Sequence, residues 1–102
     1  MAKAYWIVRV DVSDPGAYKA YATANAAAFS KYGAKFLVRG GAYDSLEGTA
    51  RGRNVVIEFK DITTARACYH SDEYRDAMAL RRFAAVADLI IIEGYDGPQP
   101  QS

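Results

Sequence analysis

The sequence predicts an α+β domain in which a four-stranded antiparallel sheet carries helices on one face. Three observations support this class: the order of the apolar segments, the alternation of side chains in four of them, and the helical spacing in the others. The segments follow one another as β-α-β-β-α-β. This order favours a single sheet whose two helical regions pack against the same side.

The first strand is expected at 4–12, where the run AYWIVRVDV is rich in β-branched and aromatic residues. A helix follows it, because Asp14 is a good N-cap and Pro15 suits the first helical position. Gly33 is a typical C-terminal stop. Between them, steps of three and four residues place one stripe on a single helix face: Tyr18, Tyr21, Asn25, Ala28 and Tyr32.

The remaining strands are marked by short apolar runs that end in turn residues. Ser71 separates two helical stretches and is well placed to cap the second. The predicted elements are strands at 35–41, 53–60 and 88–95 and helices at 62–69 and 72–87, with a loose excursion over 42–52. This is the split βαβ, ferredoxin-like pattern, expected as one domain over 1–96 with a disordered tail at 97–102.

Length and charge exclude several classes of protein. A chain of 102 residues is sufficient for one core, and a net charge of +1 gives no reason to expect nucleic acid or anionic lipid as a partner. No apolar run approaches the length of a membrane span, so we expect a cytoplasmic protein. Cys68 is the only cysteine, which excludes an internal disulfide and favours a small core residue.

An RNA-binding sheet is the alternative that the strand order raises. The segment RGRNVVIEF begins, like the third-strand motif of RNA recognition domains, with a basic residue and a glycine. The positions where bases would stack on aromatic rings hold Arg53 and Val55, and the closing aromatic position holds Glu58. We therefore expect no nucleic-acid partner.

The face of the sheet away from the helices is predicted to be too apolar for a monomer. Alternation assigns to the helix side Trp6, Val8, Val10, Phe36, Val38, Val55, Ile57, Phe59, Ile90 and Ile92. The opposite face then carries Tyr5, Ile7, Leu37, Val56, Leu89 and Ile91, together with the charged residues Arg9, Arg39, Glu58 and Glu93. A surface of this kind calls for a cover. A second copy of the chain is the simplest one, so we expect a homodimer of face-to-face sheets, a dimeric α/β barrel.

The chain resembles a known family over nearly its full length. The ordered segments are YWIVRVDVSDPGAYKAY, KYGAKFLVRGG, LEG, VVIEF, ARACYHSDEY and LIIIEG. In this order and spacing they resemble the family catalogued as domain of unknown function thirteen-thirty. The resemblance implies a dimeric α/β barrel similar to antibiotic-biosynthesis monooxygenases, and it implies no established reaction. Asp72 stands where the family usually has a proline, and it suits the first turn of a helix equally well.

The four charged residues Arg9, Arg39, Glu58 and Glu93 allow two interpretations. Arginine forks bind carboxylates, so the set is a candidate site for a small organic acid, with Glu58 as a candidate for proton transfer. Alternatively, two positive and two negative charges neutralise one another and fix the register of the dimer.

A second candidate site lies between the first helix and Trp6, by analogy with related barrels that hold aromatic substrates, and would be lined by Tyr18, Tyr21, Asn25 and Tyr32. The alternative is that these are core tyrosines, with Asn25 hydrogen-bonded locally. His70 is the only histidine and the other candidate for proton transfer; the alternative is a solvated residue at a helix junction. No residues have metal-ligand spacing and no nucleotide motif is present, so no cofactor is expected. The predicted function is binding or conversion of a small acid or aromatic metabolite; the alternative is a ligand sensor or structural dimer without turnover.

Overall fold

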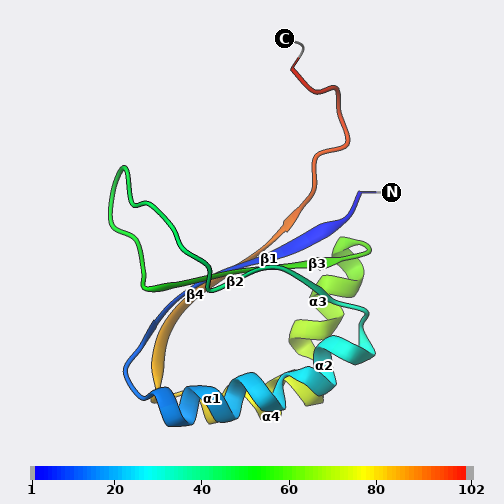
Figure 1. The fold of residues 1–102 in the computed structure, drawn as a ribbon. Coiled ribbons are helices and arrows are strands. Elements are labelled where there is room, and N and C mark those ends of the chain that lie inside the picture. Colours follow the sequence, from blue (N-terminus) through cyan, green and yellow to red (C-terminus); the bar gives the residue numbers. More distant parts are fainter. Residues whose placement is uncertain (1, 101–102) are drawn as a thin grey trace.

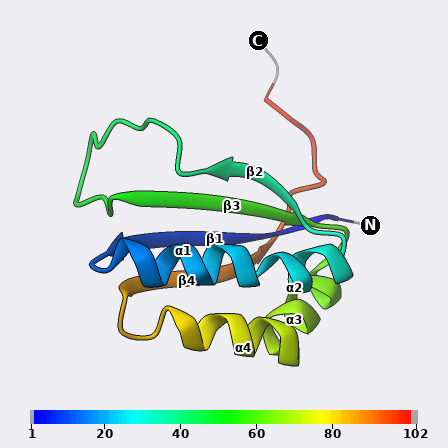
Figure 2. The same ribbon diagram turned by 60° about the horizontal axis from the view of Figure 1, so that its bottom comes forward.

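The computed structural model describes residues 2–100 and shows a ferredoxin-like α+β domain. Each predicted helical region comprises two helices, and the elements are β1 (Ala4–Val12), α1 (Pro15–Ala24), α2 (Ala26–Lys31), β2 (Lys35–Arg39), β3 (Arg53–Phe59), α3 (Ile62–His70), α4 (Asp72–Leu80) and β4 (Ala85–Glu93). The strands lie in the order β2-β3-β1-β4, and all neighbouring pairs are antiparallel. The helices cover one face of the sheet and leave the other open (Figures 1 and 2).

The predicted helix boundaries are confirmed where capping residues mark them. The carboxylate of Asp14 accepts a hydrogen bond from the Ala17 amide at 3.2 Å, and the Ser71 hydroxyl accepts one from the Tyr74 amide at 3.1 Å. Gly33 follows the second helix with a φ of 66°, a conformation that glycine adopts without strain. Capping chemistry therefore fixed both ends of the first helical region and the start of α4.

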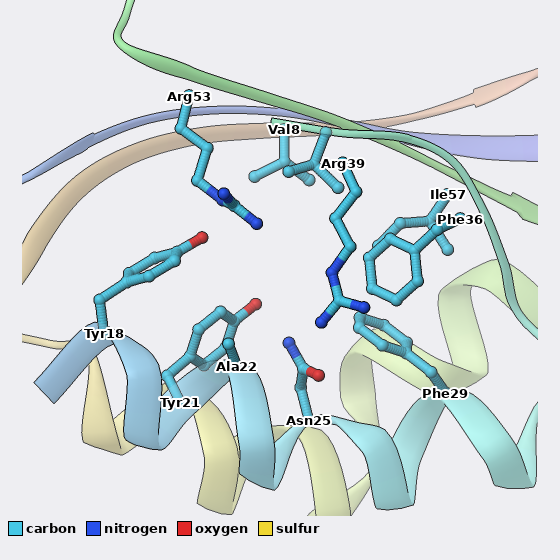
Figure 3. Close-up of a pocket in the computed structure, with 11 residues that line it drawn as sticks. Val8, Tyr18, Tyr21, Ala22, Asn25, Phe29, Phe36, Arg39, Arg53 and Ile57 are labelled. Atoms are coloured by element: carbon cyan, nitrogen blue, oxygen red, sulfur yellow. The ribbon is translucent and has the colours of Figure 1, made fainter. Parts of the chain in front are cut away.

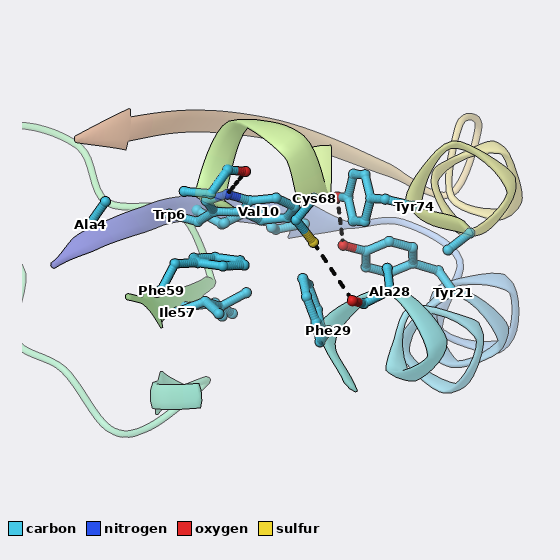
Figure 4. Close-up of a cluster of buried hydrophobic side chains, with 14 residues drawn as sticks. Ala4, Trp6, Val10, Tyr21, Ala28, Phe29, Ile57, Phe59, Cys68 and Tyr74 are labelled. Carbon is cyan, nitrogen blue, oxygen red and sulfur yellow. Dashed lines mark hydrogen bonds between the residues drawn. The ribbon is translucent and has the colours of Figure 1, made fainter. Parts of the chain in front are cut away.

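Aromatic side chains form the centre of the core between the sheet and the helices. Trp6 and Tyr74 are fully buried, and their ring centroids lie 4.9 Å apart in an edge-to-face arrangement. The indole Nε1 of Trp6 donates to the carbonyl of Ala65 at 3.0 Å (Figure 4). Trp6 thus has its polar atom satisfied inside the core, and it is not among the residues that line the pocket under the first helix, where it was expected.

A bulge in β2 reverses the predicted direction of two side chains. Phe36 pairs with Ile57 and Arg39 with Val55, whereas Leu37 has no partner on β3. Because the extra residue shifts the alternation, Arg39 joins Phe36 on the helix-facing side. The prediction that placed Arg39 on the open face is therefore wrong, since it assumed a regular strand.

The alternation predicted for β4 is also wrong. Leu89 pairs with Val8 and Ile91 with Trp6, which puts both on the helix-facing side, while Ile90 and Ile92 lie on the open face. Glu93 pairs with Ala4 and so belongs to the helix-facing side as well. The run LIII contains no polar residue that distinguishes the two faces, and a shift of one residue exchanges them all.

The last strand begins earlier than predicted. β4 starts at Ala85, in a segment that was expected to continue the helix to Ala87, and α4 ends at Leu80. The Ala84 carbonyl accepts hydrogen bonds from the Ser13 and Asp14 amides at 2.8 and 3.0 Å. These bonds hold the start of β4 against the end of β1, so tertiary contacts override the helix propensity of the alanines.

The open face nevertheless carries an apolar set beside charged residues such as Arg9, Asp11, Glu58 and Asp88, although the members of the apolar set differ from those predicted. It carries Tyr5, Ile7, Val38, Val56, Val86, Ile90 and Ile92. Ile90 and Ile92 are 55% and 48% exposed. Over residues 2–100, none of the helices has the length and apolar character needed to cross a membrane. The predicted tail extends to residues 101–102, which lie outside the described residues.

Candidate functional site

A small pocket lies between the first helical region and the helix-facing side of β1, β2 and β3 (Figure 3). Its volume is about 20 Å³, sufficient for one water molecule. The lining residues are Val8, Tyr18, Tyr21, Ala22, Asn25, Phe29, Phe36, Arg39, Arg53, Val55 and Ile57. Apolar side chains form the walls, and five residues with polar groups extend into the space from opposite sides.

Two arginines enter this pocket from the sheet. Arg39 ends β2 and Arg53 begins β3, and both side chains point toward the first helix in Figure 3. The guanidinium carbon of Arg39 lies 4.2 Å from the Phe36 ring centroid, and that of Arg53 lies 5.6 Å from the Tyr18 ring centroid. Cation–π contacts of this kind orient guanidinium groups without neutralising them.

The pocket has a surplus of positive charge. None of its lining residues carries a carboxylate, and in the described part of the chain neither Arg39 nor Arg53 forms a salt bridge. The Nε of Arg53 is buried and lacks a hydrogen-bond partner within residues 2–100. A buried donor without an acceptor is unfavourable, so the site favours a molecule that brings one.

Helix α1 provides the tyrosine hydroxyls of the pocket, and Asn25 follows it. Tyr18 is half-buried, and burial raises the pKa of its hydroxyl, with the neighbouring Tyr21 adding to the effect. The hydroxyl therefore stays protonated near neutral pH and is available as a donor. Tyr18 and Asn25 were both predicted as site residues, and the structure brings them together with Arg39. Tyr32, in the same predicted stripe, does not line this pocket.

The predicted charged set does not assemble as a unit. Arg9 and Glu58 share the open face, but Arg39 and Glu93 lie on the other side of the sheet. The Glu58 carboxylate pairs with Lys3 at 3.1 Å, and Arg9 donates to the Thr49 carbonyl at 3.0 Å. The prediction that these four residues form one self-neutralising network on the open face is therefore wrong, because it assumed regular alternation in every strand.

The two candidates for proton transfer lie outside the pocket. Glu58 is on the open face, and His70 is exposed at the end of α3 with its ring 5.3 Å from that of Tyr69. Within residues 2–100, no cluster of three potential metal-ligating side chains occurs. Cys68 is buried, as predicted, and burial raises the pKa of its thiol to about 12.

Arg53 is the site residue that sequence reasoning missed. It stands two positions before Val55 and four before Ile57, so alternation alone places it on the helix-facing side. Alternation placed Phe36 on the helix-facing side, but its contact with Phe29, with ring centroids 5.4 Å apart, depends on tertiary structure and has no signal in the sequence.

The sequence and the fold relate this chain to known proteins. The architecture is that of the ferredoxin-like α+β class. The chain belongs to the family described as domain of unknown function (DUF1330), whose model matches residues 3–95, which confirms the resemblance drawn from the sequence. No curated protein sequence matches the chain significantly.

Solved structures share the fold at low sequence identity. A protein of unknown function from Rhodopseudomonas palustris is 20% identical with a TM-score of 0.74, covering 94% of this chain and 85% of its own. SnoaB, a cofactor-independent oxygenase from Streptomyces nogalater, is 13% identical with a TM-score of 0.61, covering 98% and 97%. A dimeric ferredoxin-like protein of unknown function from Thermobifida fusca is 19% identical with a TM-score of 0.50, covering 87% and 90%.

Proposed function

We propose that this chain forms a homodimer whose subunits each bind a small organic acid in the pocket under the sheet. The observation that carries the proposal is the pair of arginines, Arg39 and Arg53, which point into a space whose lining includes no carboxylate. Guanidinium groups bind carboxylates through paired, charge-assisted hydrogen bonds. An acid in this position supplies an acceptor to the buried Nε of Arg53.

The walls of the pocket favour an acid that carries an aromatic ring. Phe29 and Phe36 form one wall, and Tyr18 stands beside Arg53. The present volume is about 20 Å³, so binding an aromatic acid requires lining side chains to move. Arg39 is an exposed residue that also lines the pocket, so its side chain can adjust to an acid that enters.

The proposal concerns binding and assigns no reaction. Neither Glu58 nor His70 lines the pocket, and no metal or nucleotide is invoked. SnoaB is described as a cofactor-independent oxygenase, but at 13% identity that likeness concerns the fold.

Calorimetric titration with benzoate, its uncharged analogue benzamide, and acetate tests the proposal. We expect benzoate to bind the wild type at least tenfold more tightly than benzamide. Arg39→Met and Arg53→Met should each lower the affinity for benzoate by roughly 10- to 100-fold, because a hydrogen bond to a charged group contributes about 1.5–3 kcal/mol. Arg51→Met is the matched control and should leave the affinity unchanged, since Arg51 is paired with acids.

Three outcomes are informative. Binding of acetate without benzoate would keep the anion site and reject the aromatic preference. Equal binding of benzoate and benzamide would reject the role of charge. No detectable binding of any of these acids to the wild type would overturn the proposed ligand class.

The homodimer is supported by the open face of the sheet. Ile90 and Ile92 are large, apolar and about half exposed at its surface, and such a patch is expected to be covered. The Thermobifida fusca structure is described as dimeric and shares the fold. In native mass spectrometry we expect a dimer for the wild type, and a monomer for Ile90→Lys. Leu46→Lys, on the exposed loop between β2 and β3, is the control that should remain dimeric. A monomeric wild type would contradict this part of the proposal.

A further inference from the structure

A chain of hydrogen bonds connects the pocket to the end of α4. The hydroxyl oxygens of Tyr21 and Tyr74 lie 2.9 Å apart, and Nη2 of Arg81 donates to the Tyr74 hydroxyl at 3.3 Å. Tyr21 lines the pocket, whereas Tyr74 is fully buried and Arg81 follows α4 as its C-cap. Figure 4 shows the contact between the two tyrosines, and Figure 3 shows the Tyr21 hydroxyl directed into the pocket beside Asn25.

The direction of this chain follows from what each group is able to donate. A guanidinium group has donors and no acceptor, so the Tyr74 oxygen must accept from Arg81. The hydrogen of Tyr74 then needs an acceptor, because the side chain is 0% exposed. Within residues 2–100, the Tyr21 oxygen lies at hydrogen-bond distance and is able to accept it. If Tyr21 donated instead, the hydrogen of Tyr74 would remain buried without a partner.

We infer that Tyr21 is held as a hydrogen-bond donor toward the pocket, with Tyr74 and Arg81 as the positioning residues that fix its direction. The Tyr21 oxygen accepts from Tyr74, which leaves its own hydrogen for a molecule in the pocket. Arg81 also lies 5.0 Å from the Tyr21 ring centroid. Burial raises the pKa of the Tyr74 hydroxyl, which keeps this link of the chain protonated.

This arrangement deepens the proposed function and rests on it for the class of ligand. Arg39, Arg53 and Tyr21 then direct three donating groups into one small space. An acid with two carboxylate oxygens satisfies donors from different sides, whereas a ligand with its own donor in that position would oppose them. Tyr21 thus acts as a specificity-determining residue that distinguishes acceptor ligands from donor ligands.

We call the hydrogen bonds from Arg81 through Tyr74 to Tyr21 the relay, and their direction is measurable without any ligand. In a mixture of H₂O and D₂O, the Cζ of a tyrosine gives two NMR signals when its hydroxyl exchanges slowly and one averaged signal when it exchanges fast. We expect two signals from Tyr74, whose hydrogen is trapped between buried oxygens, and one from Tyr21, whose hydrogen faces the pocket. Tyr21→Phe and Tyr74→Phe assign the signals. Any other pattern, including averaged signals from both residues, overturns the inference.

Titration with benzoate then tests the consequence for binding. Tyr21→Phe should lower the affinity about tenfold, as expected for one lost hydrogen bond to a charged acceptor. Arg81→Met should lower it about threefold, because the direction of the Tyr21–Tyr74 bond is then no longer fixed. Arg81→Lys restores a donor to Tyr74 and should recover most of the affinity. Recovery of benzoate affinity by Arg81→Lys would indicate that Arg81 acts through its hydrogen bond to Tyr74. Circular dichroism and the melting temperature of each variant show separately whether the fold is kept.

Failure of the inference is distinguishable from failure of the proposed function. If benzoate binds and Arg53→Met weakens it, but Tyr21→Phe and Arg81→Met bind like the wild type, the acid site stands and the relay does not. If benzoate does not bind the wild type, the NMR pattern still decides the direction of the hydroxyl.

Discussion

Arg51 and the two pocket arginines, Arg39 and Arg53, have opposite surroundings in this molecule. Arg51 donates to Asp88 at 2.8 Å and to Asp11 at 2.7 Å, so its charge is neutralised by acids on β1 and β4. Arg39 and Arg53 lie nearby in the sequence but face the helices, where the pocket has no carboxylate. The difference teaches that an arginine's partners, and not its presence in a motif, separate a structural role from a binding role.

The largest effect is expected from the glycine that makes room for the pocket arginines. Gly40 has a φ of 68°, and a Cβ there would lie 2.5 Å from Nη1 of Arg53. Gly40→Ala should therefore lower the free energy of unfolding by about 2 kcal/mol, mainly through the left-handed backbone, and displace Arg53. Urea unfolding provides the measurement.

Gly41→Ala is the matched control for this substitution. A Cβ at Gly41 meets no atom within 4 Å, and the residue has no positive φ. It should leave both stability and benzoate affinity near those of the wild type. If Gly40→Ala and Gly41→Ala lowered stability and benzoate affinity equally, a special role for the left-handed backbone at Gly40 and for its proximity to Arg53 would be contradicted.

A smaller effect of opposite sign is expected when the binding arginine itself is removed. Arg53→Met keeps an apolar stem and deletes the buried Nε that lacks a partner. In ligand-free protein it should raise the free energy of unfolding by about 1 kcal/mol. Arg51→Met should instead lower the melting temperature, because it leaves Asp11 and Asp88 without their partner. The contrast between arginines fails if both substitutions shift the melting temperature in the same direction.

Acid titration of stability gives the smallest difference between the two groups. The amide of Gly52 and the side chain of Arg51 lower the pKa of Asp11 below its usual 3.8. A carboxyl whose pKa is lower in the folded state contributes stability that is present above about pH 4 and is lost as pH falls through the folded pKa. Asp11→Asn should flatten the decline in melting temperature below pH 4. Arg53→Met should leave that decline unchanged, and a flattened profile for it would contradict the assignment.

Sequence patterns were sufficient for the architecture and insufficient for two of its strands. The caps Asp14 and Ser71 and the stop at Gly33 are local signals, so they could be predicted. The face of the sheet that each side chain of β4 takes could not be predicted, because four apolar residues in succession carry no polar residue that distinguishes the faces.

The candidate site was predicted in part for the same physical reason. The helical stripe placed Tyr18 and Asn25 on one face, and both line the pocket, since spacing along one helical region is local. Arg39 lines the pocket, but it was assigned to the wrong face of the sheet, because a bulge leaves no clear signature in the sequence. The relay joins Tyr21 to Tyr74 and Arg81, which follow it in the chain by 53 and 60 positions. No pattern in one sequence specifies contacts between residues so far apart.

The bulge at Leu37 has a further consequence for the behaviour of the protein in concentrated solution. β2 is an edge strand with every residue exposed, and unpaired edges are templates for the strands of other molecules. An irregular edge flanked by the charged residues Lys35 and Arg39 is a poor template. We therefore expect the same extra residue that turns an arginine into the pocket to disfavour aggregation along this edge.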